Sequence, residues 1–227
     1  MSASHPRSLR RSPAAPARIP LPLAVLLLAP VVACGDSGTA PQTPDDPPPV
    51  LLTGEAVDGT GDALADPALT VLPDLRSARL EKEGGVVRVQ VRFADGTYDP
   101  ALHVVLVLID TDLDPTSGLA GDGIGNDDTL LGPDRVLFLD ARTPQNSFAL
   151  SCAAPTIDAC TGIGGAIVSV TPLPGQGLDV VALEDLGGPE QPVAFKVAVF
   201  ALEGLSEEGD LFLDYMTDVG EAPTRVQ

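Results

Sequence analysis

The sequence contains no tryptophan, two tyrosines, two histidines and three cysteines. Because the other histidine lies close to the N-terminus, a Ser-His-Asp or Cys-His catalytic system would have to use His103. No GxSxG motif is present, and so few histidines and cysteines do not make up a zinc ligand set. Carboxylates for glycoside hydrolysis are numerous, but nothing in the sequence singles out a pair. These shortages argue against an enzyme.

Positive charge is also scarce, since 13 Lys and Arg residues stand against 32 Asp and Glu residues, a formal net charge of −19. Such a chain does not bind nucleic acid or an anionic lipid surface through its own charge. The acidic residues are interspersed with apolar runs in a chain that is 44% hydrophobic. This pattern predicts a folded domain with an acidic surface, suited to cations, basic partners or simply solubility.

The N-terminal segment has the order of a secretory signal. Four arginines and no acidic residue occur in residues 1–33, and an apolar run extends from Ile19 to Ala33. The run is shorter than the roughly 20 residues of a membrane-spanning helix, and three prolines interrupt it. Cleavage after Ala33 would leave nine basic residues against 32 acidic ones, a formal charge of −23.

The end of the apolar run, Val31-Val32-Ala33-Cys34, resembles the lipobox of bacterial lipoproteins. The resemblance implies that Cys34 receives a diacylglycerol group, becomes the first mature residue and anchors the protein to a membrane. Two or three acyl chains on one residue suffice for stable attachment. Gly35 in the next position is compatible with sorting to the outer membrane, under the rule familiar from enteric bacteria. The alternative is an ordinary secreted protein with an incidental cysteine.

The segment from Cys34 to Val50 is rich in Pro, Gly, Ser and Thr and lacks apolar periodicity. We interpret residues 34–50 as the lipidated cysteine and a tether that Pro47 to Pro49 partly stiffen. Residues 51–227 are of a length that fits a single folded domain.

Two further cysteines, Cys152 and Cys160, lie eight positions apart. An even pair at short spacing in an exported protein favours a disulfide that closes a surface loop. The alternative, a metal site, would need more soft ligands than the sequence offers.

Short β-prone runs separated by turn signals follow Leu51. Alternation in Val86–Phe93 predicts a half-buried strand, and the wholly apolar run after His103 predicts a strand buried on both faces. A hairpin is expected around Lys82-Glu83-Gly84-Gly85, and one short helical turn at Leu183–Leu186. The predicted strands are Leu75–Glu81, Val86–Phe93, His103–Ile109, Arg135–Leu139, Ser147–Ser151, Ala166–Thr171, Leu178–Leu183, Val193–Leu202 and Leu211–Tyr215. Many strands without crossover helices predict an all-β antiparallel sandwich of about 8–10 strands, with jelly-roll or immunoglobulin-like layering.

A series of short motifs carries a second resemblance. In chain order they are DGTGD (58–62), PDL (73–75), GTYDP (96–100), DTDLDPTSG (110–118), LGPD (131–134) and VALEDLGG followed by VAFKVAVFAL. Their order resembles that of the DOMON-like superfamily of exported β-sandwich domains, which includes the family 9 carbohydrate-binding modules. The resemblance implies a sandwich over residues 51–227. It also implies a ligand-binding role, since members of the superfamily bind sugars, haem or other ligands.

The chain departs from that family in its aromatic residues. Sugar-binding members stack pyranose rings on aromatic faces, usually tryptophan, and Arg135 stands where an aromatic residue often follows the LGxD aspartate. A haem site would need axial Met or His ligands, and His103 and Met216 are better explained as packed or edge residues. We therefore expect a non-catalytic binding or interaction module, with a carbohydrate-binding module or an envelope enzyme of unknown class as alternatives. Its partners would be an envelope protein or a glycan.

The stretch IDTDLDPTSGLAGDGIGNDDT, Ile109 to Thr129, is the strongest candidate for a cation site. Aspartates at alternate positions after a buried strand can converge on Ca²⁺, which takes six to eight oxygen ligands in irregular geometry. The stretch is not an EF-hand, since Pro115 stands where that motif has glycine and Gly121 where it has glutamate. The expected ligands are Asp110, Asp112, Asp114, Asp127, Asp128 and Asp134. The alternative is a solvated turn in which aspartates cap backbone N–H groups and Pro115 and Gly118 set the bend.

A second acidic cluster would form if the two ends of the domain meet. It would combine Asp58, Asp62 and Asp74 with Asp214 or Asp218. The sequence alone does not show that these residues come together, and their separation in space is the alternative.

Overall fold

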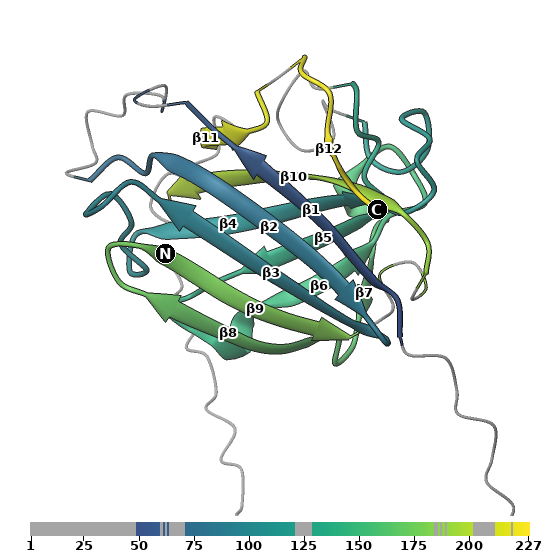
Figure 1. Cartoon of the computed structure of the whole chain (residues 1–227), viewed down its shortest axis with the longest axis horizontal. Helices are drawn as coiled ribbons and strands as arrows, with labels where there is room; N and C mark the ends of the chain where they lie inside the picture. Colours follow the sequence, from purple (N-terminus) through teal and green to yellow (C-terminus); the bar gives the residue numbers. More distant parts are fainter. Residues whose placement is uncertain are drawn as a thin grey trace, which may run out of the picture. The chain divides into compact units, whose positions relative to one another are not determined.

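The computed structural model describes residues 49–59, 61, 63, 71–120, 129–183, 186, 188, 190–201, 212–218 and 220–227. Residues Pro47–Gln227 form one compact unit. Two antiparallel sheets pack against each other in it, which confirms the predicted all-β sandwich (Figure 1). The predicted signal segment, Cys34 and the predicted tether up to residue 48 lie outside the described residues.

The described residues contain twelve strands, more than the 8–10 expected. They are β1 (Leu51–Val57), β2 (Leu75–Glu83), β3 (Val86–Phe93), β4 (His103–Asp110), β5 (Arg135–Leu139), β6 (Phe148–Ser151), β7 (Thr161–Ile163), β8 (Ile167–Leu173), β9 (Gly177–Leu183), β10 (Val193–Ala201), β11 (Phe212–Met216) and β12 (Thr224–Val226). Two short 3-10 helices, η2 (Pro144–Asn146) and η3 (Ile157–Ala159), flank β6 and the segment that follows it. One sheet has the order β1-β2-β3-β9-β8, and the other has the order β11-β10-β4-β5-β6-β7 with β12 paired to β10.

All nine predicted strands are present, with ends within two residues of those expected. The three strands that the sequence pattern missed are β1, β7 and β12. Strands β7 and β12 have three residues each, too few for a periodic signal, and β1 contains Gly54. A Cβ at Gly54 would lie 2.5 Å from the carbonyl oxygen of Arg225, so the glycine allows close approach of β12. The helical turn expected at Leu183–Leu186 falls partly outside the described residues.

The strand β4 is buried along its whole length, as its apolar run predicted. Val105, Val107 and Ile109 face the core between the two sheets. On the opposite face, Val104, Leu106 and Leu108 belong to a second apolar cluster, together with Leu119 and Leu131 of the following loop. The aspartate-rich loop is thus held against the outer face of the sheet by its own leucines.

The two sides of the sandwich differ. At one side β12 pairs with β10, and its end exchanges hydrogen bonds between Gln227 and Thr53 of β1, at 3.2 and 3.4 Å. This closed flank, made of β1, β12 and β10, joins the two sheets. At the other side, the open flank of β6, β7 and β8, the chain crosses from one sheet to the other through Gly164–Ala166 (Figure 1).

Candidate functional site

The aspartate-rich loop begins at Asp110, the last residue of β4. Its side chain is buried, with 2% of the residue surface exposed, and its Oδ1 accepts the N–H groups of Asp112 at 3.1 Å and Leu113 at 2.6 Å. Leu113 has a φ of 59°, a left-handed conformation that is costly for a leucine. The carboxylate therefore shapes a sharp turn directly after the strand.

The alternating spacing continues this pattern along the loop. Asp112 Oδ1 accepts the Asp114 N–H and the Ser117 hydroxyl, both at 3.0 Å. Asp114 Oδ1 accepts the Thr116 N–H at 2.9 Å and the Thr116 hydroxyl at 2.7 Å, and these bonds lower the pKa of Asp114. Each aspartate thus binds the backbone two residues further on, which is the capping geometry that the turn alternative described.

Asp134 closes the base of the loop. Its Oδ1 accepts the Thr111 N–H at 3.1 Å, and its Oδ2 accepts the Thr111 hydroxyl. Its own N–H donates to the carbonyl of Ile109 at 3.1 Å. Asp127 and Asp128, the remaining expected ligands, lie outside the described residues.

Two glycines allow the two halves of the loop to touch: Gly118, which the turn alternative had placed at the bend, and Gly132, which had been given no role. Gly118 and Gly132 have φ of 66° and 61°. A Cβ at Gly118 would lie 2.5 Å from the carbonyl oxygen of Pro133, and one at Gly132 would lie 2.7 Å from those of Pro115 and Ser117. The signal was present in the LGPD motif, because a glycine before a proline is typical of a constrained turn.

The electrostatics of the loop centre on Asp110. Burial raises the pKa of Asp110 to about 6, the nearby Asp112 carboxylate adds to the rise, and the Leu113 N–H opposes it. Within the part of the chain that is described, no three Asp, Glu, His or Cys side chains are grouped so as to hold a metal ion. The described carboxylates therefore act mainly as hydrogen-bond acceptors for the N–H groups of the loop's own backbone.

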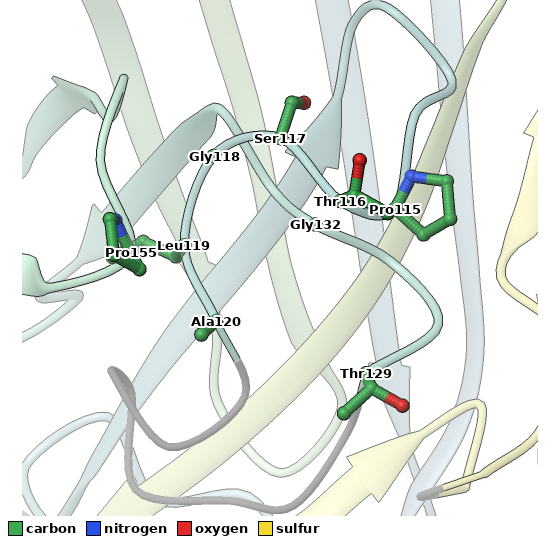
Figure 2. Close-up of a pocket in the computed structure, with 9 residues that line it drawn as sticks. All are labelled: Pro115, Thr116, Ser117, Gly118, Leu119, Ala120, Thr129, Gly132 and Pro155. Carbon is green, nitrogen blue, oxygen red and sulfur yellow. The ribbon is translucent and has the colours of Figure 1, made fainter.

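A small hollow lies beside the loop. Its volume is about 190 Å³, below the roughly 300 Å³ at which small-molecule pockets begin. Pro115 and Pro155 lie on opposite sides of it, and Thr116, Ser117 and Thr129 line it as well (Figure 2). The hydroxyls of Thr116 and Ser117 already donate to Asp114 and Asp112, so few polar groups face the space.

The predicted disulfide joins Cys152 and Cys160. The loop it closes contacts the aspartate-rich loop at two places, since the Cys152 N–H donates to the Asp134 carbonyl at 2.8 Å and the Ala120 N–H donates to the Pro155 carbonyl at 3.1 Å. Two features that the sequence presented separately therefore form one structural unit on the outer face of the sheet.

The second acidic cluster is partly brought together. Asp214 Oδ2 accepts the Leu75 N–H at 2.5 Å, so the start and the end of the domain meet beside Asp74. The Asp74 carboxylate accepts the Gly61 N–H at 3.3 Å. Asp62 lies outside the described residues, and the Asp218 carbonyl accepts a hydrogen bond from Lys196 at 3.0 Å.

His103 is enclosed and has no exposed surface. Its Nδ1 accepts the Asp99 N–H at 3.1 Å, and its Nε2 lies 3.1 Å from the Val71 carbonyl oxygen, to which the neutral ring donates. Burial lowers the pKa of His103, which favours this neutral form. Both ring nitrogens are engaged by backbone groups, and Met216 is likewise buried in the core.

Comparisons with protein-family models, with curated proteins and with solved structures gave no match to this chain. Membership of the DOMON-like superfamily stays a prediction. None of the helices in the described residues is long and apolar enough to cross a membrane.

Proposed function

We propose that this protein is a non-catalytic lipoprotein of the bacterial cell envelope, whose β-sandwich is a binding or interaction module anchored through Cys34. The observation that carries the proposal is the Val31–Cys34 sequence at the end of a short apolar run, followed by a tether that leads into a single sandwich. The outer membrane is the proposed location, and an envelope protein or a glycan is the proposed ligand.

The surroundings of His103 support a non-catalytic role. A general base must reach the proton that it removes, directly or through one water. Both nitrogens of His103 face backbone groups inside the domain, and the ring has no exposed surface. To activate a nucleophile, Nδ1 would have to release the Asp99 N–H and the enclosed ring would have to become accessible.

The lipid anchor is tested by growing cells that express the full chain with an alkyne-bearing fatty acid and then labelling the purified chain. We expect label on the natural chain and none on Cys34→Ala, because the thioether and the amino group of Cys34 carry all the acyl chains. The double variant Cys152→Ala, Cys160→Ala is the matched control and should keep its label. Equal labelling of the natural chain and Cys34→Ala would refute the anchor.

We further propose that Ca²⁺ stabilises the aspartate-rich loop. Among the residues that the structure describes, Asp110 and Asp112 would be its ligands. The supporting observation is that the Asp110 carboxylate is buried and lies near that of Asp112; burial, and then this neighbour, raise the pKa of Asp110 to about 6. A divalent cation would favour the charged form of both groups. The hydrogen bonds that these carboxylates accept from the backbone do not prevent Ca²⁺ binding, because each carboxylate has further lone pairs that can coordinate the ion.

The calcium proposal is tested by thermal melts of the full chain in nonionic detergent, with Ca²⁺ or with chelator. At Ca²⁺ 100-fold above its dissociation constant, the midpoint should rise by roughly 5 to 10 °C. In chelator, stability should fall as the pH rises through about 6, because the folded state binds the Asp110 proton more tightly than the unfolded state does. Ca²⁺ should reduce that loss.

Two variants sharpen the calcium test. Asp112→Asn should abolish the effect of Ca²⁺, whereas Asp158→Asn, which alters an exposed aspartate of the disulfide loop, should retain it. A midpoint that is the same with Ca²⁺ and with chelator would contradict the proposal without touching the lipid anchor.

A further inference from the structure

Charge is distributed very unevenly along this chain. From Thr143 to Leu178, a span of 36 residues, Asp158 is the one charged residue. The 20 residues from Ala159 to Leu178 contain no Asp, Glu, Lys, Arg or His, in a chain whose formal charge is −19. A gap of this length in so acidic a chain calls for a structural explanation.

The structure places this span along the open flank. It supplies β6 and β7, at one edge of their sheet, and β8, the edge strand of the other sheet. As far as the chain is described, no further strand pairs with the outer side of β7 or β8. At the opposite side of the sandwich β12 pairs with β10, whereas β7 and β8 are edge strands that lie on the same side as the uncharged residues (Figure 1).

The open flank is also partly apolar. Val168, in β8, is 57% exposed, and Phe148, in β6, is exposed as well. Edge strands of monomeric proteins are usually protected by charged side chains, by proline or by bulges. Here Pro172 and a bulge between Ile167 and Ser169 interrupt β8, but no charged side chain protects it.

One other surface of the domain is charged. The outer face of the five-stranded sheet carries ion pairs between Arg79 and Glu81 at 2.7 Å and between Arg92 and Asp179 at 2.6 Å. A basic partner would be attracted to acidic surfaces and would gain nothing from a neutral flank. A second copy of this chain is repelled wherever acidic residues would face each other, and among the described surfaces the uncharged open flank offers little such repulsion.

We propose that two copies of this chain associate through the open flank, with the two β8 edges antiparallel about a two-fold axis. Such an interface uses the same patch on both copies, so uncharged residues face uncharged residues. Pairing along Ser169–Thr171, between the bulge and Pro172, joins the two five-stranded sheets into one. Val168 of each copy loses exposed apolar surface in the contact.

The first test is sedimentation velocity of the full chain in nonionic detergent, at low and at high salt. We expect a dimer whose affinity increases with ionic strength, because salt screens the repulsion between two acidic domains. Val168→Lys should raise the dimer dissociation constant at least tenfold with an unchanged melting midpoint. Val57→Lys is the matched control, since Val57 is 74% exposed on β1 of the closed flank, and it should leave the constant unchanged.

Three results would overturn the proposal: a monomer at every protein and salt concentration, a dimer that weakens as salt is added, or equal effects of the two lysine variants. None of them bears on the labelling of Cys34, so this inference stands or falls separately from the lipid anchor.

Cross-linking gives a second measurement that does not depend on the lysine variants. Residues paired across antiparallel strands lie about 4.5 to 5.5 Å apart at Cα, within disulfide range. A two-fold axis at Val170 places Ser169 of one copy opposite Thr171 of the other. In intact cells the double variant Ser169→Cys, Thr171→Cys should therefore give a disulfide-linked dimer on a non-reducing gel. Ser77→Cys, on β2 of the same sheet, is the control and should not link. A linked dimer with Ser77→Cys, or no linked dimer with the double variant, would contradict the two-fold arrangement.

Discussion

Single residues determine the shape of the aspartate-rich loop, and glycines matter as much as aspartates. Asp110, Asp112 and Asp114 cap successive backbone N–H groups, a local arrangement that alternate spacing made predictable. Gly118 and Gly132 permit a contact between segments more than ten residues apart, which no local rule indicates. The aspartates therefore set the path of each turn, and the glycines set how closely the turns pack.

Replacing Gly132 with alanine should be strongly destabilising. The positive φ of 61° alone costs a Cβ-bearing residue about 1 kcal/mol, and the clash with backbone 2.7 Å away adds to this cost. We expect a loss of about 3 kcal/mol in the free energy of unfolding, measured by chemical denaturation.

Gly96→Ala is the control for that loss. Gly96 has a comparable φ of 78°, but an added Cβ would have no neighbour within 4 Å, so about 1 kcal/mol should be lost. Equal losses in the two variants would show that backbone strain, and not close packing, explains the glycine at 132.

At the scale of elements, alternation and apolar runs identified the strands that make up the core. Val87, Val89, Val91 and Phe93 face inward in β3, as the period of two requires. Strand β12 (Thr224–Val226) could not be found in this way, because three residues are too few to show a period. Its extended form depends on pairing with β10 and on the bonds between Gln227 and Thr53 of β1. Local pattern thus reveals long strands, whereas short ones depend on their neighbours.

The disulfide loop is an element whose contribution can be measured. Closing so short a loop should stabilise the domain by about 2 to 3 kcal/mol. The double variant Cys152→Ala, Cys160→Ala should lose this amount in chemical denaturation, and a reductant should lower the stability of the natural chain equally. Reductant should have no effect on the double variant. If the natural chain were as stable with reductant as without it, the disulfide would contribute nothing.

At the scale of the whole molecule, the uncharged part of the sequence coincides with the open side of the sandwich. The closed flank uses the C-terminal strand to join two sheets, and the open flank collects the uncharged span from Thr143 to Leu178. Long-range repulsion keeps strongly acidic domains apart, so a neutral edge is where two copies can approach. The salt dependence of dimerisation proposed above is the measurement that belongs to this scale.

The sequence by itself determined the class of fold, the position of the long strands and the pairing of Cys152 with Cys160, because periodicity and short spacing are local properties. It also supplied the lipobox-like segment Val31–Cys34 on which the proposed anchor depends. The tertiary structure alone decided that Asp134 binds Thr111, that the disulfide loop packs against the aspartate-rich loop, and that β7 and β8 form one uncharged flank. These contacts join residues distant in sequence, and such proximity arises only when the two sheets pack and bring their edges and loops together.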